Sequence, residues 1–167
     1  MTTLILTVAG SDRPGLVAAV ADIVDAHGGN WESSQLAELA GVFAGVIQVS
    51  VAAEHEADLQ QALRALDGTL TVSVHTGADA QARDQPITLQ ILGNDRPGIV
   101  REVSAVLRAH DLSIHDMTTE TRDAAMAGGR LFEASVAATV PASADLAALR
   151  ADLERLTSEL QVDITLD

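Results

Sequence analysis

The chain has 167 residues, of which 47% are hydrophobic and only 2% aromatic, and its formal net charge is −14. Ten basic residues that form no run, together with so few aromatic side chains, argue against direct nucleic-acid binding, which needs cationic and stacking groups. The lack of cysteine excludes disulfides, thiolate metal sites and cysteine nucleophiles.

The first ten residues have no basic segment followed by a long apolar run, as a signal peptide has. No apolar stretch approaches the roughly 20 residues of a membrane span. We therefore expect a cytoplasmic protein that makes no contact with a membrane. An aliphatic core divided between small domains also favours oligomerisation, since small domains bury a smaller share of their surface.

An internal repeat organises the chain. Residues 10–17 (GSDRPGLV) return as residues 93–100 (GNDRPGIV), and the gapless match continues as far as His27 and His110. A duplication of this length predicts two equivalent folding units. We place the first domain at residues 1–76, a linker at 77–86 and the second domain at 87–167.

The first element expected in each half is a strand. Apolar residues alternate with more variable ones, a period of two that indicates one buried face, at Leu4, Leu6 and Val8 and again at Ile87, Leu89 and Ile91. A helix follows, with Pro14 and Pro97 expected in its first turn. Its apolar stripe has the 3.6-residue period of a buried helix face and comprises Leu16, Val17, Val20, Ile23 and Val24, matched by Ile99, Val100, Val103, Val106 and Leu107.

Two extended segments come next in each half, at about 30–38 and 42–53 and at about 112–122 and 130–140. A second helix then carries leucines on one face, with Ser143 as the expected N-cap in the second half. A last strand closes each half. The order βαββαβ, found twice, predicts an α+β fold: two ferredoxin-like domains in tandem, each an antiparallel sheet with helices on one face.

The DRPG turn between the first strand and the first helix is the sharpest candidate site. Free N–H groups at a helix N-terminus bind carboxylates and other anions, and Gly15 and Gly98 leave the backbone open to approach. Ser11 and Asn94 add short polar groups. The alternative is a capped helix start without a ligand, and the sequence leaves both interpretations open.

This motif, D-R-P-G-[LI]-V between a strand and a helix, resembles the ACT domain, and the resemblance covers both halves. It implies a small amino acid, such as glycine, bound where two ACT domains pair, and a homodimer. The ligand contacts that it implies are Ser11, Asp12, Gly15, Asn30 and Trp31, and in the second repeat Asn94, Asp95, Gly98, Ser113 and Ile114. Because the repeats differ at the last two positions, one site is expected to be empty or altered.

A chain of two such repeats is similar to the glycine cleavage system transcriptional repressor family. That similarity implies a regulatory protein that senses an amino acid and acts on a partner, such as a transcription factor of glycine or one-carbon metabolism, without touching DNA. The alternative is a ligand-free interaction module. An enzyme is not expected, because no nucleophile and base can be named, and neither a cofactor nor a metal is expected.

The remaining candidates have structural explanations. His27 and His110 are expected to cap helix C-termini, and His115 is expected to be an exposed strand residue rather than a ligand contact. The carboxylates follow the polar faces of helices. Trp31 is either a core residue or a neighbour of the ligand site, and the sequence does not separate the two.

Overall fold

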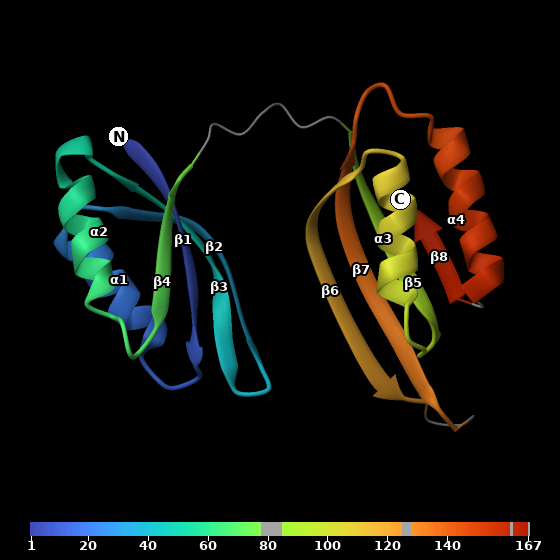
Figure 1. Ribbon diagram of the computed structural model, residues 1–167, viewed down its shortest axis with the longest axis horizontal. Helices are drawn as coiled ribbons and strands as arrows, with labels where there is room; N and C mark the ends of the chain where they lie inside the picture. Colours follow the sequence, from blue (N-terminus) through green and yellow to red (C-terminus); the bar gives the residue numbers. More distant parts are fainter. Residues whose placement is uncertain (78–84, 125–127, 161, 167) are drawn as a thin grey trace. The chain divides into compact units, whose positions relative to one another are not determined.

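The computed structural model describes residues 1–77, 85–124, 128–160 and 162–166. The chain divides into two compact units, Met1–Asp79 and Ala80–Asp167 (Figure 1). Each unit has the order βαββαβ, which confirms the predicted α+β fold of two tandem domains.

The first unit carries one short 3₁₀ turn in addition to the expected elements. Its elements are β1 (Thr2–Ser11), α1 (Leu16–Ala26), β2 (Asn30–Leu39), β3 (Val42–Val51), η1 (Ala53–His55), α2 (Glu56–Arg64) and β4 (Thr71–Thr76). The second unit consists of β5 (Gln85–Asn94), α3 (Ile99–Ala109), β6 (Ser113–Asp123), β7 (Arg130–Val140), α4 (Leu146–Leu160) and β8 (Val162–Leu166).

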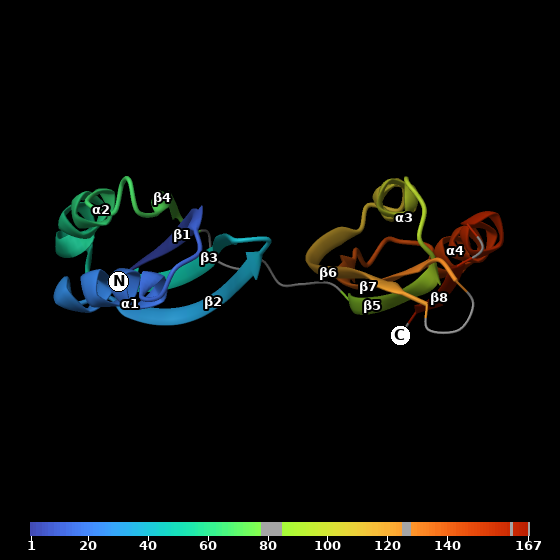
Figure 2. The ribbon, with the colours of Figure 1, turned by 90° about the horizontal axis from the view of Figure 1, so that it is seen from below.

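Each unit is a four-stranded antiparallel sheet, ordered β2-β3-β1-β4 in the first and β6-β7-β5-β8 in the second. The helices cover one face of the sheet, α1 and α2 in the first unit (Figure 1) and α3 and α4 in the second (Figure 2). The other face carries no helix from the described residues of either unit, and we call it the open face.

The cores lie between helices and sheet, and each unit has its own. The predicted buried positions of β1 and β5 are confirmed: Leu4 and Leu6 are fully buried and Ile87 is 8% exposed. Val17 and Val100 were predicted in the buried stripe but are 43% and 42% exposed. Each valine directly follows the first buried residue of its helix. One residue along a helix turns the side chain by about 100°, which points it away from the sheet.

The helix starts differ from the prediction. Pro14 precedes α1 by two residues and Gly15 is the N-cap, so the proline is not in the first helical turn. The N-cap of α4 is Asp145 rather than Ser143, since its Oδ1 accepts hydrogen bonds from the N–H groups of Ala147 and Ala148 at 2.9 and 3.1 Å.

The predicted linker is only partly described. Residues 78–84 lie outside the described residues, whereas Gln85 and Pro86 already belong to β5 and pair with Val140 and Thr139. The second repeat therefore begins before Ile87. Among the helices in the described ranges, none has the length and apolar character to cross a membrane.

Candidate functional site

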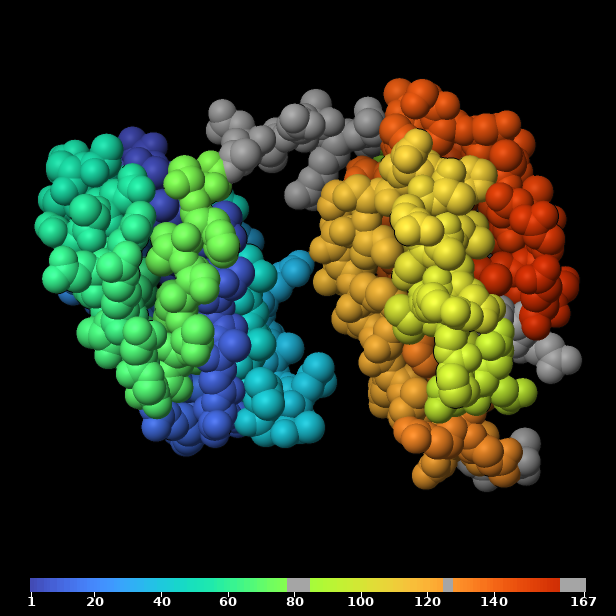
Figure 3. Space-filling view, in the orientation of Figure 1, coloured from blue at the N-terminus to red at the C-terminus, as the bar shows by residue number. Residues whose placement is uncertain are grey.

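The β1–α1 loop of the first repeat is bound to the β2–β3 hairpin. The N–H of Asp12 donates to the carbonyl oxygen of Gly41 at 2.9 Å. In the space-filling view, the loop (blue) and the hairpin (cyan) lie next to each other at the lower end of the first unit (Figure 3). This contact fixes the position of Asp12, and Ser11 ends β1 beside it.

Gly15 gives the loop its shape. Its φ of 91° lies in the left-handed region, which favours glycine, and an added methyl group would meet nothing within 4 Å. The glycine is therefore required by the backbone conformation, and the space beside it is open. No side chain caps the N-terminus of α1, and its first helical hydrogen bond runs from the N–H of Ala19 to the carbonyl oxygen of Gly15.

The corresponding loop of the second repeat has the same backbone but a different charge arrangement. Gly98 has a φ of 97°, and the N–H of Asp95 donates to the carbonyl oxygen of Arg130 at 2.8 Å. Here, however, Nη2 of Arg96 lies 2.9 Å from Oε2 of Glu102, in the first turn of α3. The guanidinium of Arg96 is therefore already paired with a carboxylate of the protein itself, that of Glu102.

The first repeat has no such carboxylate. Ala19 stands where the second repeat has Glu102, and Arg13, the counterpart of Arg96, is exposed. Within the described residues Arg13 makes no ion pair. The two loops that look alike in sequence therefore differ in the charge that they offer to an anion.

The other predicted contacts lie at the opposite end of each sheet. Asn30 pairs with Ser50, which pairs with Thr3 near the start of β1, whereas Leu39 pairs with Val42 beside the loop. Ten strand residues at about 3.3 Å each separate the two ends by about 30 Å. A single repeat therefore does not bring Asn30 and Trp31 to its own DRPG turn, and the same register applies to Ser113 and Ile114.

Trp31 packs against the core of the first unit and is half-buried, which supports its interpretation as a core residue. Its counterpart Ile114 is 38% exposed. The exposed Asn30 donates from Nδ2 to Oε1 of Glu32 at 2.9 Å.

A β-bulge follows these residues in both repeats, at Glu32 in β2 and at His115 in β6. Oε1 of Glu32 accepts a hydrogen bond from Oγ of Ser50 at 2.6 Å, and this bond, with that from Asn30, lowers the pKa of the Glu32 carboxyl. In the second repeat, His115 contacts the hydroxyl of Thr139 instead. His115 is exposed, as predicted.

The two histidines at the ends of α1 and α3 make different contacts. His27 donates from Nδ1 to the carbonyl oxygen of Ile23 at 2.8 Å, which confirms its capping role, whereas His110 bonds to Asp152 on α4 rather than to its own helix. In the described part of the chain, no group of three or more His, Asp or Glu side chains is placed to hold a metal ion.

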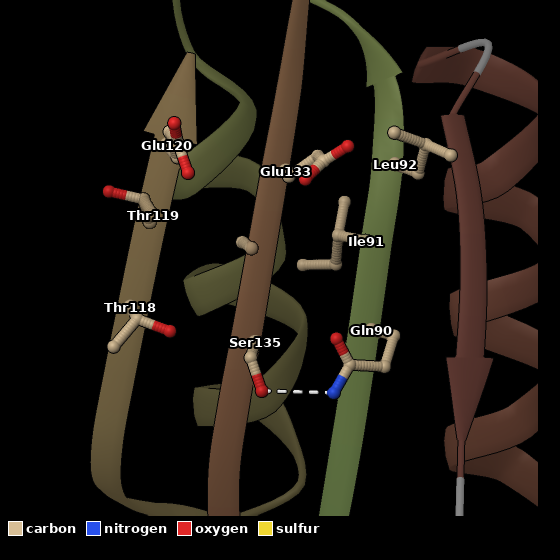
Figure 4. Close-up of a pocket in the computed structure, with 9 residues that line it drawn as sticks. Gln90, Ile91, Leu92, Thr118, Thr119, Glu120, Glu133 and Ser135 are labelled. Carbon is tan, nitrogen blue, oxygen red and sulfur yellow. Dashed lines mark hydrogen bonds between the residues drawn. The ribbon is translucent and has the colours of Figure 1, made fainter. Parts of the chain in front are cut away.

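Sequence reasoning missed one polar surface entirely. A shallow cavity of about 550 Å³ lies on the open face of the second sheet, over β5, β6 and β7 (Figure 4). Nε2 of Gln90 donates to Oγ of Ser135 at 2.9 Å, and Glu120 is paired directly with Glu133. The strand periodicity marked these positions only as solvent-facing, and no motif distinguishes them.

Comparisons with known proteins identify both repeats. The ACT domain matches residues 2–77 and again residues 81–163. The chain is 26% identical over 161 residues to the glycine cleavage system transcriptional repressor of Escherichia coli, a match that covers 94% of this chain and 85% of that protein. The repressor of the same name from Shigella flexneri matches equally.

A solved structure gives the same result over the full length. The crystal structure of an unknown protein from Galdieria sulphuraria is 31% identical and has a TM-score of 0.90, covering 99% of this chain and 97% of that one. The two matched segments account for nearly all of the sequence. The chain therefore belongs to the ACT-domain family, as a tandem pair of ACT domains.

Proposed function

We propose that this protein senses a small amino acid at the β1–α1 loop of its first repeat and thereby changes how it engages a protein partner. The observation that carries the proposal is the exposed N-terminus of α1, which has no side-chain cap and lies beside Arg13, a residue that forms no ion pair with any described part of the chain. Free N–H groups and a guanidinium are the donors that a carboxylate prefers.

Pairing of two ACT domains completes the site. β2 is an edge strand, and antiparallel pairing of two such edges places the start of one strand opposite the end of the other. The end of β2 adjoins the loop through the bond between Asp12 and Gly41. Paired edges would therefore bring Asn30 and Trp31 of one domain to the loop of the other, although they lie apart within one repeat.

The two repeats are not expected to bind equally. In the second repeat, Glu102 already neutralises Arg96, so an amino-acid carboxylate would compete with a bound carboxylate. In the first repeat, Ala19 leaves the arginine available. We therefore assign the ligand to the loop formed by Ser11, Asp12 and Gly15, and we regard the loop of Asn94, Asp95 and Gly98 as the weaker site.

The names of the relatives suggest a ligand and a partner for this protein. Two of them are named as transcriptional repressors of the glycine cleavage system, so we propose glycine as the first ligand to test and a transcription factor as the partner. A net charge of −14 disfavours direct contact with DNA and favours a basic partner surface. The ligand acts by binding one state of the protein more tightly than another.

The test is a titration of the full chain with each of the twenty amino acids. Binding is monitored by the melting temperature of the protein and by the fluorescence of Trp31, the only tryptophan in the sequence. We expect saturable binding of one or two amino acids. Arg13→Ala should weaken it by about tenfold or more, since a charge-assisted contact to a carboxylate is lost. Arg64→Ala removes the same charge from the exposed end of α2 and is the matched control.

A second function is favoured by one observation. Leu39 and Val42, which flank the β2–β3 turn, are 76% and 53% exposed, so the edge of the first sheet also suits an interaction module that adds a partner strand. If no amino acid changes either signal, or if Arg13→Ala and Arg64→Ala behave alike, sensing at this loop is wrong and the interaction module takes its place.

A further inference from the structure

The open face of the first sheet carries almost no charge. The strand register places on it a set of side chains without any Asp, Glu, Lys or Arg, apart from Glu32 at the edge bulge. The set comprises Thr3, Ile5, Thr7, Ala9 and Ser11; Val42, Ala44, Val46, Gln48 and Ser50; Asn30, Ser33, Gln35, Ala37 and Leu39; and Thr71, Ser73 and His75. Charged residues make up 20% of the chain, so an uncharged surface of this extent needs an explanation.

The half of this face nearest the hairpin is also apolar. Val46 is 44% exposed and Val42 is 53% exposed, and Ala44 is exposed between them. Ala44 pairs with Ala9 on one side and with Ala37 on the other, so the apolar residues are contiguous across three strands. Contiguous exposed apolar patches in soluble proteins mark interaction surfaces.

The second repeat shows that the fold itself does not demand this composition. The positions of Ala37 and Ala44 are occupied there by Glu120 and Glu133, which pair in the same register, and Ser135 stands at the position of Val46. The open face of the second sheet is thus polar and charged, as Figure 4 shows. The uncharged face is a property of the first repeat alone.

We propose that the open face of the first sheet packs against the same face of a second copy of this chain, forming a two-fold homodimer. Two chains of charge −14 repel each other, and this face lets them meet without bringing carboxylates together. Small side chains such as Ala44 and Val46 allow two sheets to stack at about 10 Å. The charged face of the second repeat is a poor partner, because burying Glu120 and Glu133 against it would desolvate them.

The area suffices for such a dimer. Strands rise about 3.3 Å per residue and lie about 4.8 Å apart, so a sheet of four strands of this length presents on the order of 600 Å² to a partner. Two such faces together bury about 1,200 Å², the lower end of the range for specific interfaces. Ser11 and Asn30, two of the proposed ligand contacts, lie at the two ends of this face, so the dimer shares part of its surface with the proposed function. Val46 lies midway between them in the register, so failure of the dimer and failure of amino-acid sensing are measured with different variants, Val46→Lys and Arg13→Ala.

Sedimentation of the full chain tests the proposal, with Val46→Lys as the disruptive variant. Because Val46 is partly exposed, the lysine leaves the fold intact, which circular dichroism verifies. We expect the wild type to dimerise and Val46→Lys to raise the dimer dissociation constant by about tenfold or more. Ser135→Lys adds the same charge at the matching position of the second repeat and should change it by less than about twofold.

Crosslinking locates the interface directly, because the chain has no cysteine of its own. Val46→Cys should form covalent dimers with a short bis-maleimide, and Ser135→Cys should not. A monomeric wild type, a dimer that survives Val46→Lys, or equal crosslinking of the two cysteine variants would each overturn the proposal. A dimer that survives would point to pairing at the β2 edge instead.

Discussion

Nε2 of His110, at the C-terminal end of α3, donates a hydrogen bond to Oδ2 of Asp152 in α4 across 2.8 Å. The bond joins the two helices that cover the second sheet. In the first repeat, His27 occupies the same position but bonds to the carbonyl oxygen of Ile23 in its own helix. One residue of the ancestral repeat thus caps a helix in one copy and links two helices in the other.

The hydrogen bond between His110 and Asp152 predicts that the stability of the second repeat depends on pH. The hydrogen bond from His110 lowers the pKa of the Asp152 carboxyl below its usual value of 3.8, and Arg155 adds to the effect. The folded state then binds fewer protons than the unfolded state, so the stabilisation is complete above that usual value and is lost as the pH falls below it. Asp152→Asn should remove this part of the acid sensitivity.

Urea unfolding between about pH 6 and pH 3 measures the effect. Far-UV circular dichroism reports both repeats, and Trp31 reports only the first. We expect Asp152→Asn to weaken the pH dependence of the dichroism transition and to leave the Trp31 transition unchanged. An unchanged pH dependence of the second repeat would contradict the assigned role of the bond.

Gly15→Ala tests whether the glycine of the loop is needed for its backbone or for access. Its φ of 91° strains any other residue, and the left-handed conformation costs about 1–2 kcal/mol, while the added methyl group meets no atom within 4 Å. We expect a loss of about that size in the free energy of unfolding of the first repeat. Denaturant titration followed at Trp31 measures it, and a loss well above this range would indicate a contact that the structure does not contain.

Gly45 in β3 is constrained by packing instead. A methyl group there would overlap the carbonyl oxygen of Gln35 and lie 2.6 Å from Cδ2 of Leu36. The second repeat has Ala134 at this position, and the residue at the place of Leu36 is the smaller Thr119. The two repeats therefore fill the same space with opposite combinations of small and large side chains.

This pairing predicts coupling between the two positions. Gly45→Ala should destabilise the first repeat by about 1–3 kcal/mol, the range for overpacking a close-packed site. Adding Leu36→Thr should recover part of the loss, as expected for residues in contact. Additive losses in this double-mutant cycle, again followed by Trp31, would show that the two side chains do not share the space.

Much of the fold was predictable, because the repeat supplied two independent versions of each element. The alternation at Leu4, Leu6 and Val8 identified the buried face of β1. The start of α1 was predicted wrongly, since Pro14 is compatible with both a helical turn and the turn before it. Only the observed φ of Gly15 distinguishes the two.

The site was less accessible from the sequence, because it depends on partners that are remote in the chain. Nothing in the motif reveals that Asn30 lies at the far end of the sheet from Asp12; the strand register does. The uncharged open face was equally hidden, since its residues alternate with core residues on three strands. The signal that would have found it is a comparison, between the two repeats, of the charged residues on each face of each strand.

The ion pair between Arg96 and Glu102 leads to a prediction about stoichiometry. If Arg13 alone is free to bind a carboxylate, each wild-type chain should bind one amino acid. Glu102→Ala recreates in the second repeat the situation that Ala19 produces in the first. The partly exposed pair contributes about 0–1 kcal/mol to stability, so the variant should remain folded.

We expect calorimetric titration with the amino acid that the wild type binds to give one site per chain, and Glu102→Ala to add a second, weaker site. Glu154→Ala removes a carboxylate from an exposed position of α4 and should leave the stoichiometry at one. Two equal sites in the wild type would show that Glu102 does not block its loop. A single site in Glu102→Ala would show that the differences at Ser113 and Ile114, rather than the carboxylate, disable the second repeat.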